Sequence, residues 1–81
     1  MSHFMDSRVL AIVSRLFHVN AGELTPESGP TTIAAWDSAG HMNLILALEQ
    51  EFGIQFGDDE VAELISVGAI NAALARHSVT S

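Results

Sequence analysis

The 81-residue sequence contains no cysteine, so it has no disulfide framework and no side-chain thiol of its own. No apolar stretch approaches the roughly 18 residues that a membrane-spanning helix needs, so we expect no membrane association. The first residues lack the basic region, apolar core and cleavage site of a secretory signal, and we therefore expect a cytoplasmic protein.

Positive charge is also scarce. Three arginines and no lysine stand against ten acidic residues, which gives a formal net charge of −7. No basic residue lies between Arg15 and Arg76, whereas seven acids fall between Asp37 and Glu63. Such a surface repels nucleic acid and anionic lipid and attracts proteins with basic patches. The same acidity is also a common way to keep a small domain soluble.

The usual signatures of catalysis and metal binding are missing. There is no G-x-S-x-G elbow, no glycine-rich phosphate loop and no EF-hand pattern. The four histidines do not show H-x-x-x-H spacing, so no metal site is expected. A hydrolase built on Ser38 would need a base, and the nearest histidine, His41, falls on a predicted core face. We therefore expect a protein that is not an enzyme.

The sequence does contain the pattern of a small helical protein, and its 48% hydrophobic content favours a folded globule. Helical spacing predicts a first helix over residues 5–18, with one apolar face made of Val9, Ile12, Val13, Leu16 and Phe17. A long loop follows, and three apolar residues are expected to pin it to the core: Leu24, Ile33 and Trp36. Residues 1–4 are interpreted as an addition ahead of a natural start at Met5 or as disordered, and residues 78–81 as a frayed tail.

Three further helices are expected. The second spans Ser38–Phe52 and ends at Gly53, with a core face made of His41, Leu44, Ile45, Leu48 and Phe52. A short third helix is capped by Asp58 or Asp59 and carries Val61, Leu64 and Ile65. Ser66 caps the fourth helix, which buries Val67, Ile70 and Leu74. The predicted fold is an all-α four-helix bundle with a long first loop and a short third helix.

The second helix has another apolar face. Ala39, Met42 and Leu46 lie at i, i+3 and i+7, on the side away from the predicted core face. Two interpretations are open: the long loop covers this strip, or the strip is an exposed docking surface. The second is favoured because the strip begins beside Ser38 and because methionine suits adaptable contacts.

The stretch DSAGHMNLILALEQEFGIQF, which begins at Asp37, resembles the acyl carrier protein family. In that family an Asp-Ser pair opens the second helix, and an apolar and acidic pattern ends in Glu-x-x-Phe-Gly-Ile. The resemblance covers nearly the whole chain, because DDEVAELISVGAINAAL matches the third and fourth helices. It implies one carrier domain over residues 1–81 with the bundle described above.

The resemblance also implies a cofactor. In this family the serine receives 4′-phosphopantetheine from coenzyme A, so Ser38 is the expected attachment site. Asp37 is the expected recognition residue for the phosphopantetheinyl transferase. The arm supplies a thiol that holds acyl or aminoacyl groups as thioesters, which suits a chain without cysteine.

The implied partners are an acyl- or aminoacyl-loading ligase and downstream transferases with basic docking patches, and the chain is expected to be a monomer. The expected contact residues are Ala39, Met42, Leu46, Glu49, Asp58, Asp59, Glu60 and Glu63. Ala39 stands where the family usually has leucine. Trp36 before the Asp-Ser pair resembles discrete carriers of specialised polyketide, nonribosomal or aminoacyl pathways.

An alternative remains at this point. Serine near a helix start is often only a cap, worth about 1 kcal/mol. On that interpretation the chain is an unmodified acidic interaction module, and Ser38 has no chemical role.

Overall fold

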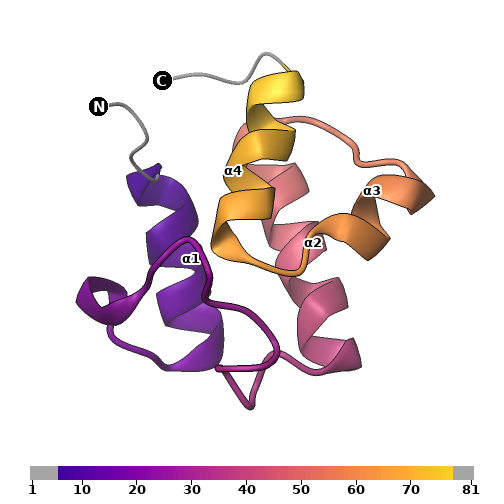
Figure 1. Cartoon of the computed structure of the whole chain (residues 1–81). Helices are drawn as coiled ribbons and strands as arrows, with labels where there is room; N and C mark the ends of the chain where they lie inside the picture. Colours follow the sequence, from indigo (N-terminus) through magenta and orange to yellow (C-terminus); the bar gives the residue numbers. More distant parts are fainter. Residues whose placement is uncertain (1–5, 78–81) are drawn as a thin grey trace.

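The computed structural model describes residues 6–77, and between these residues the chain is all-helical, without strands. Four α-helices and one 3-10 helix occur in the order α1 (Ser7–Phe17), η1 (Ala21–Glu23), α2 (Ser38–Phe52), α3 (Asp58–Glu63) and α4 (Val67–Arg76) (Figure 1). The predicted fold class is therefore confirmed. The predictions for residues 1–4 and 78–81 lie outside the described residues.

Helix α1 lies between the caps Asp6 and His18 and buries one apolar face. The Asp6 carboxylate accepts the backbone N–H of Arg8 at 2.8 Å, and His18 ends the helix in the left-handed region at φ 57°. These caps shorten the predicted range of 5–18 to Ser7–Phe17. Of the five predicted apolar positions, Leu16 is only half-buried and the other four belong to the core: Val9, Ile12, Val13 and Phe17.

Helix α2 has the predicted ends. It begins at Ser38 and stops at Gly53, which takes φ 65°, a conformation that glycine adopts without strain. Leu44, Ile45 and Leu48 are buried as predicted. His41 and Phe52, at the two ends of the same face, are half-buried.

Helix α3 differs from the prediction at both ends. Its N-cap position is Gly57, so the prediction that Asp58 or Asp59 caps the helix is wrong. These two acids lie in its first turn, where the helix dipole favours negative charge. The helix ends at Glu63, which leaves Leu64 buried behind it and Ile65 outside it, 58% exposed. Ile65 is therefore not part of the core face to which its spacing had assigned it.

The long first loop is held against the start of α4. The carbonyls of Ser28 and Pro26 accept the backbone N–H groups of Val67 and Gly68, each at 2.9 Å. Ser66 caps α4 as predicted, since its hydroxyl accepts the Ala69 N–H at 3.0 Å. The three predicted loop anchors are all buried: Leu24, Ile33 and Trp36.

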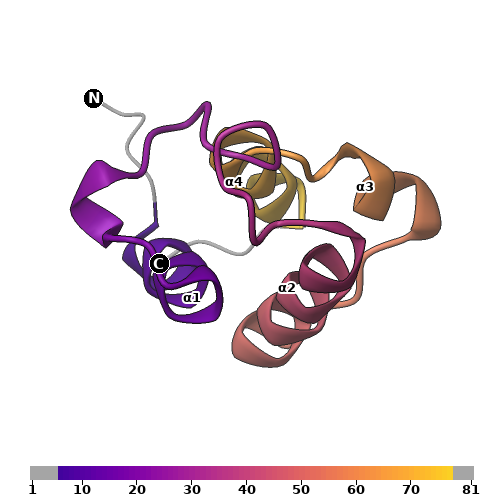
Figure 2. The same ribbon diagram turned by 90° about the horizontal axis from the view of Figure 1, so that it is seen from below.

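Helices α1, α2 and α4 surround one core, and α3 lies to one side (Figures 1 and 2). The view from below shows the first loop crossing the end of the bundle where α2 begins (Figure 2). The fold therefore brings the start of α2, the loop and the α3–α4 connection to the same end of the molecule.

Candidate functional site

Ser38 is the first residue of α2, and its side chain is exposed. The helix is capped by its neighbour, because the Asp37 carboxylate accepts the Gly40 N–H at 2.8 Å. Within residues 6–77 the Ser38 hydroxyl makes no hydrogen bond. The interpretation of Ser38 as a helix cap is therefore wrong, and its oxygen is free to react.

An open pocket of about 320 Å³ lies directly beside this hydroxyl. It is formed where the first loop, the start of α2 and the segment after α3 meet. The residues that line it are Pro30, Trp36, Asp37, Ser38, His41 and Ile65. Its walls are mainly apolar, and the carboxylate of Asp37 and the hydroxyl of Ser38 lie on it.

His41 closes the pocket on the side of the core. The Trp36 indole N–H donates to His41 Nδ1 at 2.9 Å, and His41 Nε2 lies 2.8 Å from the Val61 carbonyl oxygen. An indole N–H can only donate and a carbonyl can only accept, so in this arrangement Nδ1 accepts and Nε2 donates. Both nitrogens are thus engaged, and His41 is not available as a base for Ser38.

Gly40 permits the close approach of the loop to α2. A Cβ at this position would collide with the carbonyl oxygen of Ala35 and come within 3.0 Å of Phe17 Cε1. Glycine normally weakens a helix interior, but here it lets the loop reach the first turn of α2. Sequence reasoning missed this role, because the contact joins two segments whose packing is visible only in three dimensions.

The second face of α2 is exposed. Met42 and Leu46 are 50% and 54% exposed, and Ala39 is exposed as well. The first loop does not cover them, so the interpretation of a strip buried under the loop is wrong. Ile65 is the third large hydrophobic side chain exposed within residues 6–77, and it was not among the predicted site residues.

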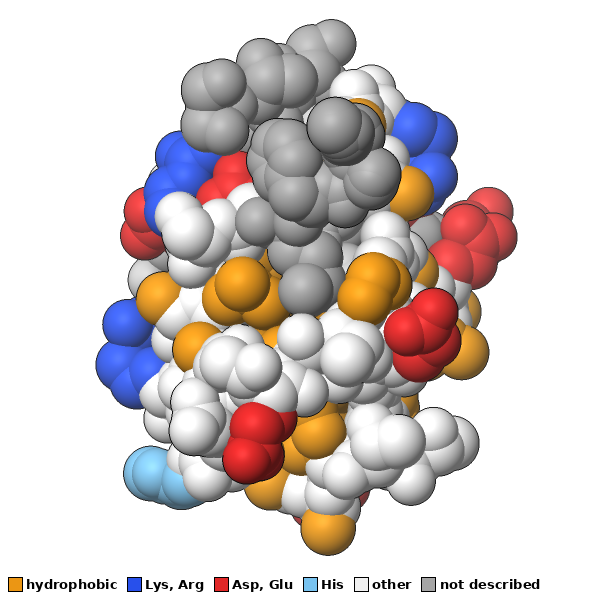
Figure 3. Space-filling model, turned by 60° about the vertical axis from the view of Figure 1, so that its left-hand side comes forward, with side chains coloured by type: hydrophobic (Ala, Val, Ile, Leu, Met, Phe, Trp, Pro, Cys, Tyr) orange, Lys and Arg blue, Asp and Glu red, His pale blue; other side chains and the backbone are white. Residues whose placement is uncertain are grey.

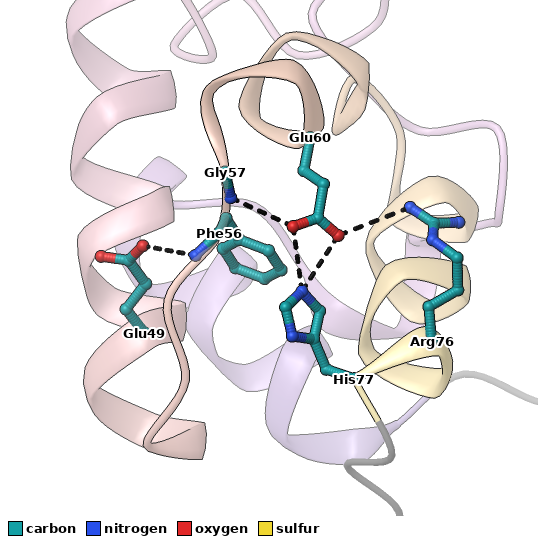
Figure 4. Close-up of polar contacts among 6 residues, drawn as sticks. All are labelled: Glu49, Phe56, Gly57, Glu60, Arg76 and His77. Atoms are coloured by element: carbon teal, nitrogen blue, oxygen red, sulfur yellow. Dashed lines mark hydrogen bonds and ion pairs between the residues drawn. The ribbon is translucent and has the colours of Figure 1, made fainter.

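Two acids among the expected contact residues, Glu49 and Glu60, have partners inside the molecule (Figure 4). Glu49 Oε2 accepts the Phe56 N–H at 2.9 Å and fixes the connection between α2 and α3. Glu60 accepts the Gly57 N–H at 3.1 Å and the His77 Nε2–H at 3.0 Å, and it lies 3.8 Å from Arg76 Nη2. These carboxylates are therefore structural as well as charged.

These contacts shift the acidity of Glu60. The backbone N–H of Gly57 and, after it, the His77 ring hold the pKa of Glu60 below its ordinary value of 4.5. The carboxylate therefore stays ionised at neutral pH and links the start of α3 to the end of α4.

The other three acids among the expected contact residues are exposed: Asp58, Asp59 and Glu63. Their side chains make no hydrogen bond or ion pair within the part of the chain that the structure describes. On the side that lies to the left in Figure 1, by contrast, arginine side chains stand among acidic ones (Figure 3). Because opposite charges are mixed there, that side presents no uniformly acidic patch among the described residues.

Between residues 6 and 77, no group of three or more histidine, aspartate or glutamate side chains is placed to hold a metal ion. Among the described helices, none has the length and apolar character needed to span a bilayer.

Comparison with known proteins assigns this sequence to a family. The chain is 30% identical to the protein named Acyl carrier protein from Helicobacter pylori strain G27 and to that from strain HPAG1. Each match spans 70 residues, which are 86% of this chain and 87% of the relative. The chain belongs to the acyl carrier protein family. The same-named protein of strain ATCC 700392 / 26695 is 31% identical over the same length, whereas no family model matches.

Membership in the acyl carrier protein family indicates a carrier role and implies a phosphopantetheine group. Of the residues expected to serve that role, the structure brings Asp37, Ser38, Ala39 and Met42 together in the first turns of α2. An exposed serine without a hydrogen bond, at the start of a helix, fits such a group sterically and chemically.

Proposed function

We propose that this chain carries acyl or aminoacyl groups as thioesters on a 4′-phosphopantetheine arm attached to Ser38. It presents these groups to partner enzymes and has no catalytic activity of its own. The observation that carries the proposal is the exposed Ser38 hydroxyl, free of hydrogen bonds, in a chain of the acyl carrier protein family. We also propose that the protein is a monomer and that it acts in the cytoplasm.

The start of α2 suits a phosphodiester. Ser38 Oγ would lose its proton and bond to the phosphorus of coenzyme A that carries the pantetheine, while 3′,5′-ADP leaves. The product anion lies at the positive end of the helix dipole, near the N–H groups of Ser38 and Ala39, which have no partner within residues 6–77. Asp37 adds like charge, which we assign to recognition by the transferase.

The arm would supply the thiol that the chain lacks. Attachment to Ser38 keeps the cargo at high effective concentration near any enzyme that docks on the body of the protein. We assign docking to the exposed strip of α2, made of Ala39, Met42 and Leu46, together with the acids among the expected contact residues. The exposed acids Asp58, Asp59 and Glu63 are the best placed to meet a basic patch, since Glu49 and Glu60 already have internal partners.

We also propose a specialised pathway rather than fatty-acid synthesis. This part rests on the resemblance of Trp36-Asp37-Ser38 to discrete carriers of such pathways. Trp36 also has a structural reason to be present, because it is 1% exposed and stacks on Phe17 with ring centroids 5.4 Å apart. Identification of the loading ligase by assaying acyl and aminoacyl substrates on the modified protein tests this part separately.

Intact-protein mass tests the attachment. Incubation with coenzyme A and a broad-specificity phosphopantetheinyl transferase should add the mass of one arm, and Ser38→Ala should abolish the gain. Ser7 offers a matched control, since it is also exposed, follows a capping aspartate (Asp6) and begins a helix. Ser7→Ala should be modified normally. A gain that persists in Ser38→Ala would contradict the proposal.

The rival is an interaction module that acts without modification. Its premise of a capping serine does not hold, because Asp37 is the cap, but the exposed strip could still bind a partner. Partner binding that is unchanged in Ser38→Ala and independent of coenzyme A would favour this rival. Binding or transfer that requires the modified form would exclude it.

A further inference from the structure

The pocket beside Ser38 is not explained by attachment or docking alone. Its volume of about 320 Å³ lies at the lower end of the range for small-ligand sites. Its apolar wall consists of Pro30, Trp36 and Ile65, which come from the loop and from the segment after α3. Ile65 is 58% exposed although it is a large aliphatic side chain next to a reactive hydroxyl.

A group attached to Ser38 has three nearby apolar surfaces: the core, the α2 strip and the pocket. The route into the core past His41 is closed by two hydrogen bonds, from Trp36 to His41 and from His41 to Val61. Beyond them Leu44 and Leu64 are fully buried in a close-packed interior. Entry would break both bonds and leave buried polar groups unpaired.

The α2 strip is a less favourable resting place than the pocket. Met42 and Leu46 lie on the exposed face of a helix, where a small group contacts only one surface. In the pocket the same group meets the loop, the helix and Ile65 together, so it gains more contacts per atom. Asp37 on the pocket wall repels a phosphate, which keeps the anionic part outside and leaves only neutral atoms to enter.

We propose that the pocket lined by Pro30, Trp36 and Ile65 holds the neutral part of the phosphopantetheine arm nearest its phosphate. That part carries two methyl groups on one carbon, which match an apolar wall. The arm leaves Ser38 across Ile65 and remains outside the core, and the α2 strip stays free for partner enzymes. This inference rests on the attachment to Ser38 proposed above.

The test is NMR on isotope-labelled protein that carries an unlabelled arm, after intact mass has shown full modification. Filtered nuclear Overhauser effects should join the two methyl groups of the arm to Ile65 and Pro30. Trp36 is the single tryptophan, so its one indole N–H signal should shift between the unmodified and modified forms.

A pair of matched variants makes the assignment specific. Ile65 lies outside the helices and Leu46 is similarly exposed, so Ile65→Ser and Leu46→Ser should both fold. In Ile65→Ser the contacts between the arm and Pro30 should be lost and the Trp36 shift should shrink. In Leu46→Ser both signals should match those of the parent protein.

The possible outcomes separate this inference from the proposed function. Protein without a mass gain overturns both. If the protein is modified but the arm contacts neither Pro30 nor Ile65, only the assignment of the arm to the pocket is overturned. Contacts with Met42, or with core residues such as Leu64, in place of the pocket residues have the same consequence. Arm contacts that are equally strong in Ile65→Ser and in the parent overturn it as well.

Discussion

At the scale of single residues, the residues that stabilise the first turn of α2 are different from the residue that is available to react. Asp37 caps the helix, Gly40 gives the loop room, and His41 is hydrogen-bonded to both Trp36 and Val61. Ser38 lies among them and takes part in none of these contacts. Its hydroxyl can therefore be esterified without breaking a bond that the fold uses.

Gly40→Ala tests the packing at this turn. Alanine normally favours a helix over glycine by about 1 kcal/mol, but overpacking against a backbone carbonyl costs about 1–3 kcal/mol. Because the Ala35 carbonyl cannot turn aside as a side chain can, the collision should prevail. We expect Gly40→Ala to lower the free energy of unfolding by about 1 kcal/mol, and by no more than about 2 kcal/mol, in urea titrations.

Gly22→Ala is the matched control for this change. A Cβ at Gly22 has no atom nearer than Asn20 Oδ1 at 3.4 Å, so stability should be unchanged or slightly higher. Equal stability of the two variants would contradict the close approach of the loop to α2. Gly40→Ala should also slow modification of Ser38, because the shifted loop displaces the Asp37–Ser38 turn.

At the scale of elements, α3 is the helix that depends most on its contacts with other segments. It has six residues, which is too short to be stable alone, and none of them is fully buried. Glu60 supplies the missing support, because one carboxylate accepts the Gly57 N–H at the start of α3 and faces His77 and Arg76 at the end of α4 (Figure 4).

Glu60→Gln tests this link through its pH dependence. The pKa of Glu60 is lowered by folding, so its contribution is present above the ordinary value of 4.5 and is lost as pH falls through the folded value. The parent protein should therefore exceed Glu60→Gln in stability near neutral pH, and the difference should vanish in acid. Thermal unfolding at several pH values measures it.

Glu27→Gln removes the same charge from an exposed loop position, where the side chain makes no hydrogen bond or ion pair within residues 6–77. Its difference from the parent should be small and show little pH dependence. If Glu60→Gln behaves like Glu27→Gln over the whole pH range, the carboxylate does not link α3 to α4.

The elements also show where sequence patterns carry structural information. Both ends of α2 and the Ser66 cap of α4 follow from local chemistry, so they were predicted correctly. The start of α3 was predicted wrongly. Its N-cap is Gly57, whose backbone N–H donates to the Glu60 carboxylate, and no aspartate side chain caps the helix. Ile65 was assigned to a helix face from its spacing, but it lies in the non-helical connection between α3 and α4, where its carbonyl packs closely against Gly29.

In the candidate site, too, features set by local sequence could be predicted and features set by tertiary packing could not. Ser38, Asp37 and the strip with Met42 and Leu46 could be identified from one continuous stretch of sequence. The pocket could not, because its walls come from three separate segments that meet only in the folded chain. The internal roles of Glu49 and Glu60 were likewise invisible in a count of acidic residues.

At the scale of the whole molecule, the distribution of charge is the feature most relevant to partners. Helix α3, which carries the exposed acids Asp58, Asp59 and Glu63, is joined to the start of α2 by the hydrogen bond between His41 and the Val61 carbonyl. Arginines, by contrast, stand among acids on the side shown in Figure 3. Attraction between exposed charges falls off beyond about 8 Å at physiological ionic strength, so docking to a basic enzyme should depend on salt.

Kinetics of the modifying transferase test this dependence. The KM for the unmodified chain should rise with salt, and the Asp58→Asn, Asp59→Asn double variant should raise it at low salt and flatten its salt dependence. The Glu23→Gln, Glu27→Gln double variant removes the same charge from η1 and the first loop and should change KM much less. If the two double variants change KM equally, or if KM does not depend on salt, the acids of α3 do not steer the transferase. Recognition would then depend on the apolar contacts of Met42 and Leu46.

The central claim is that Ser38 carries the arm, and fragmentation mass spectrometry of the transferase-treated protein tests it most directly. The account predicts one added phosphopantetheine per chain, located on Ser38 and on no other serine. Modification at Ser7, or an unmodified chain in the presence of an active transferase, would contradict it.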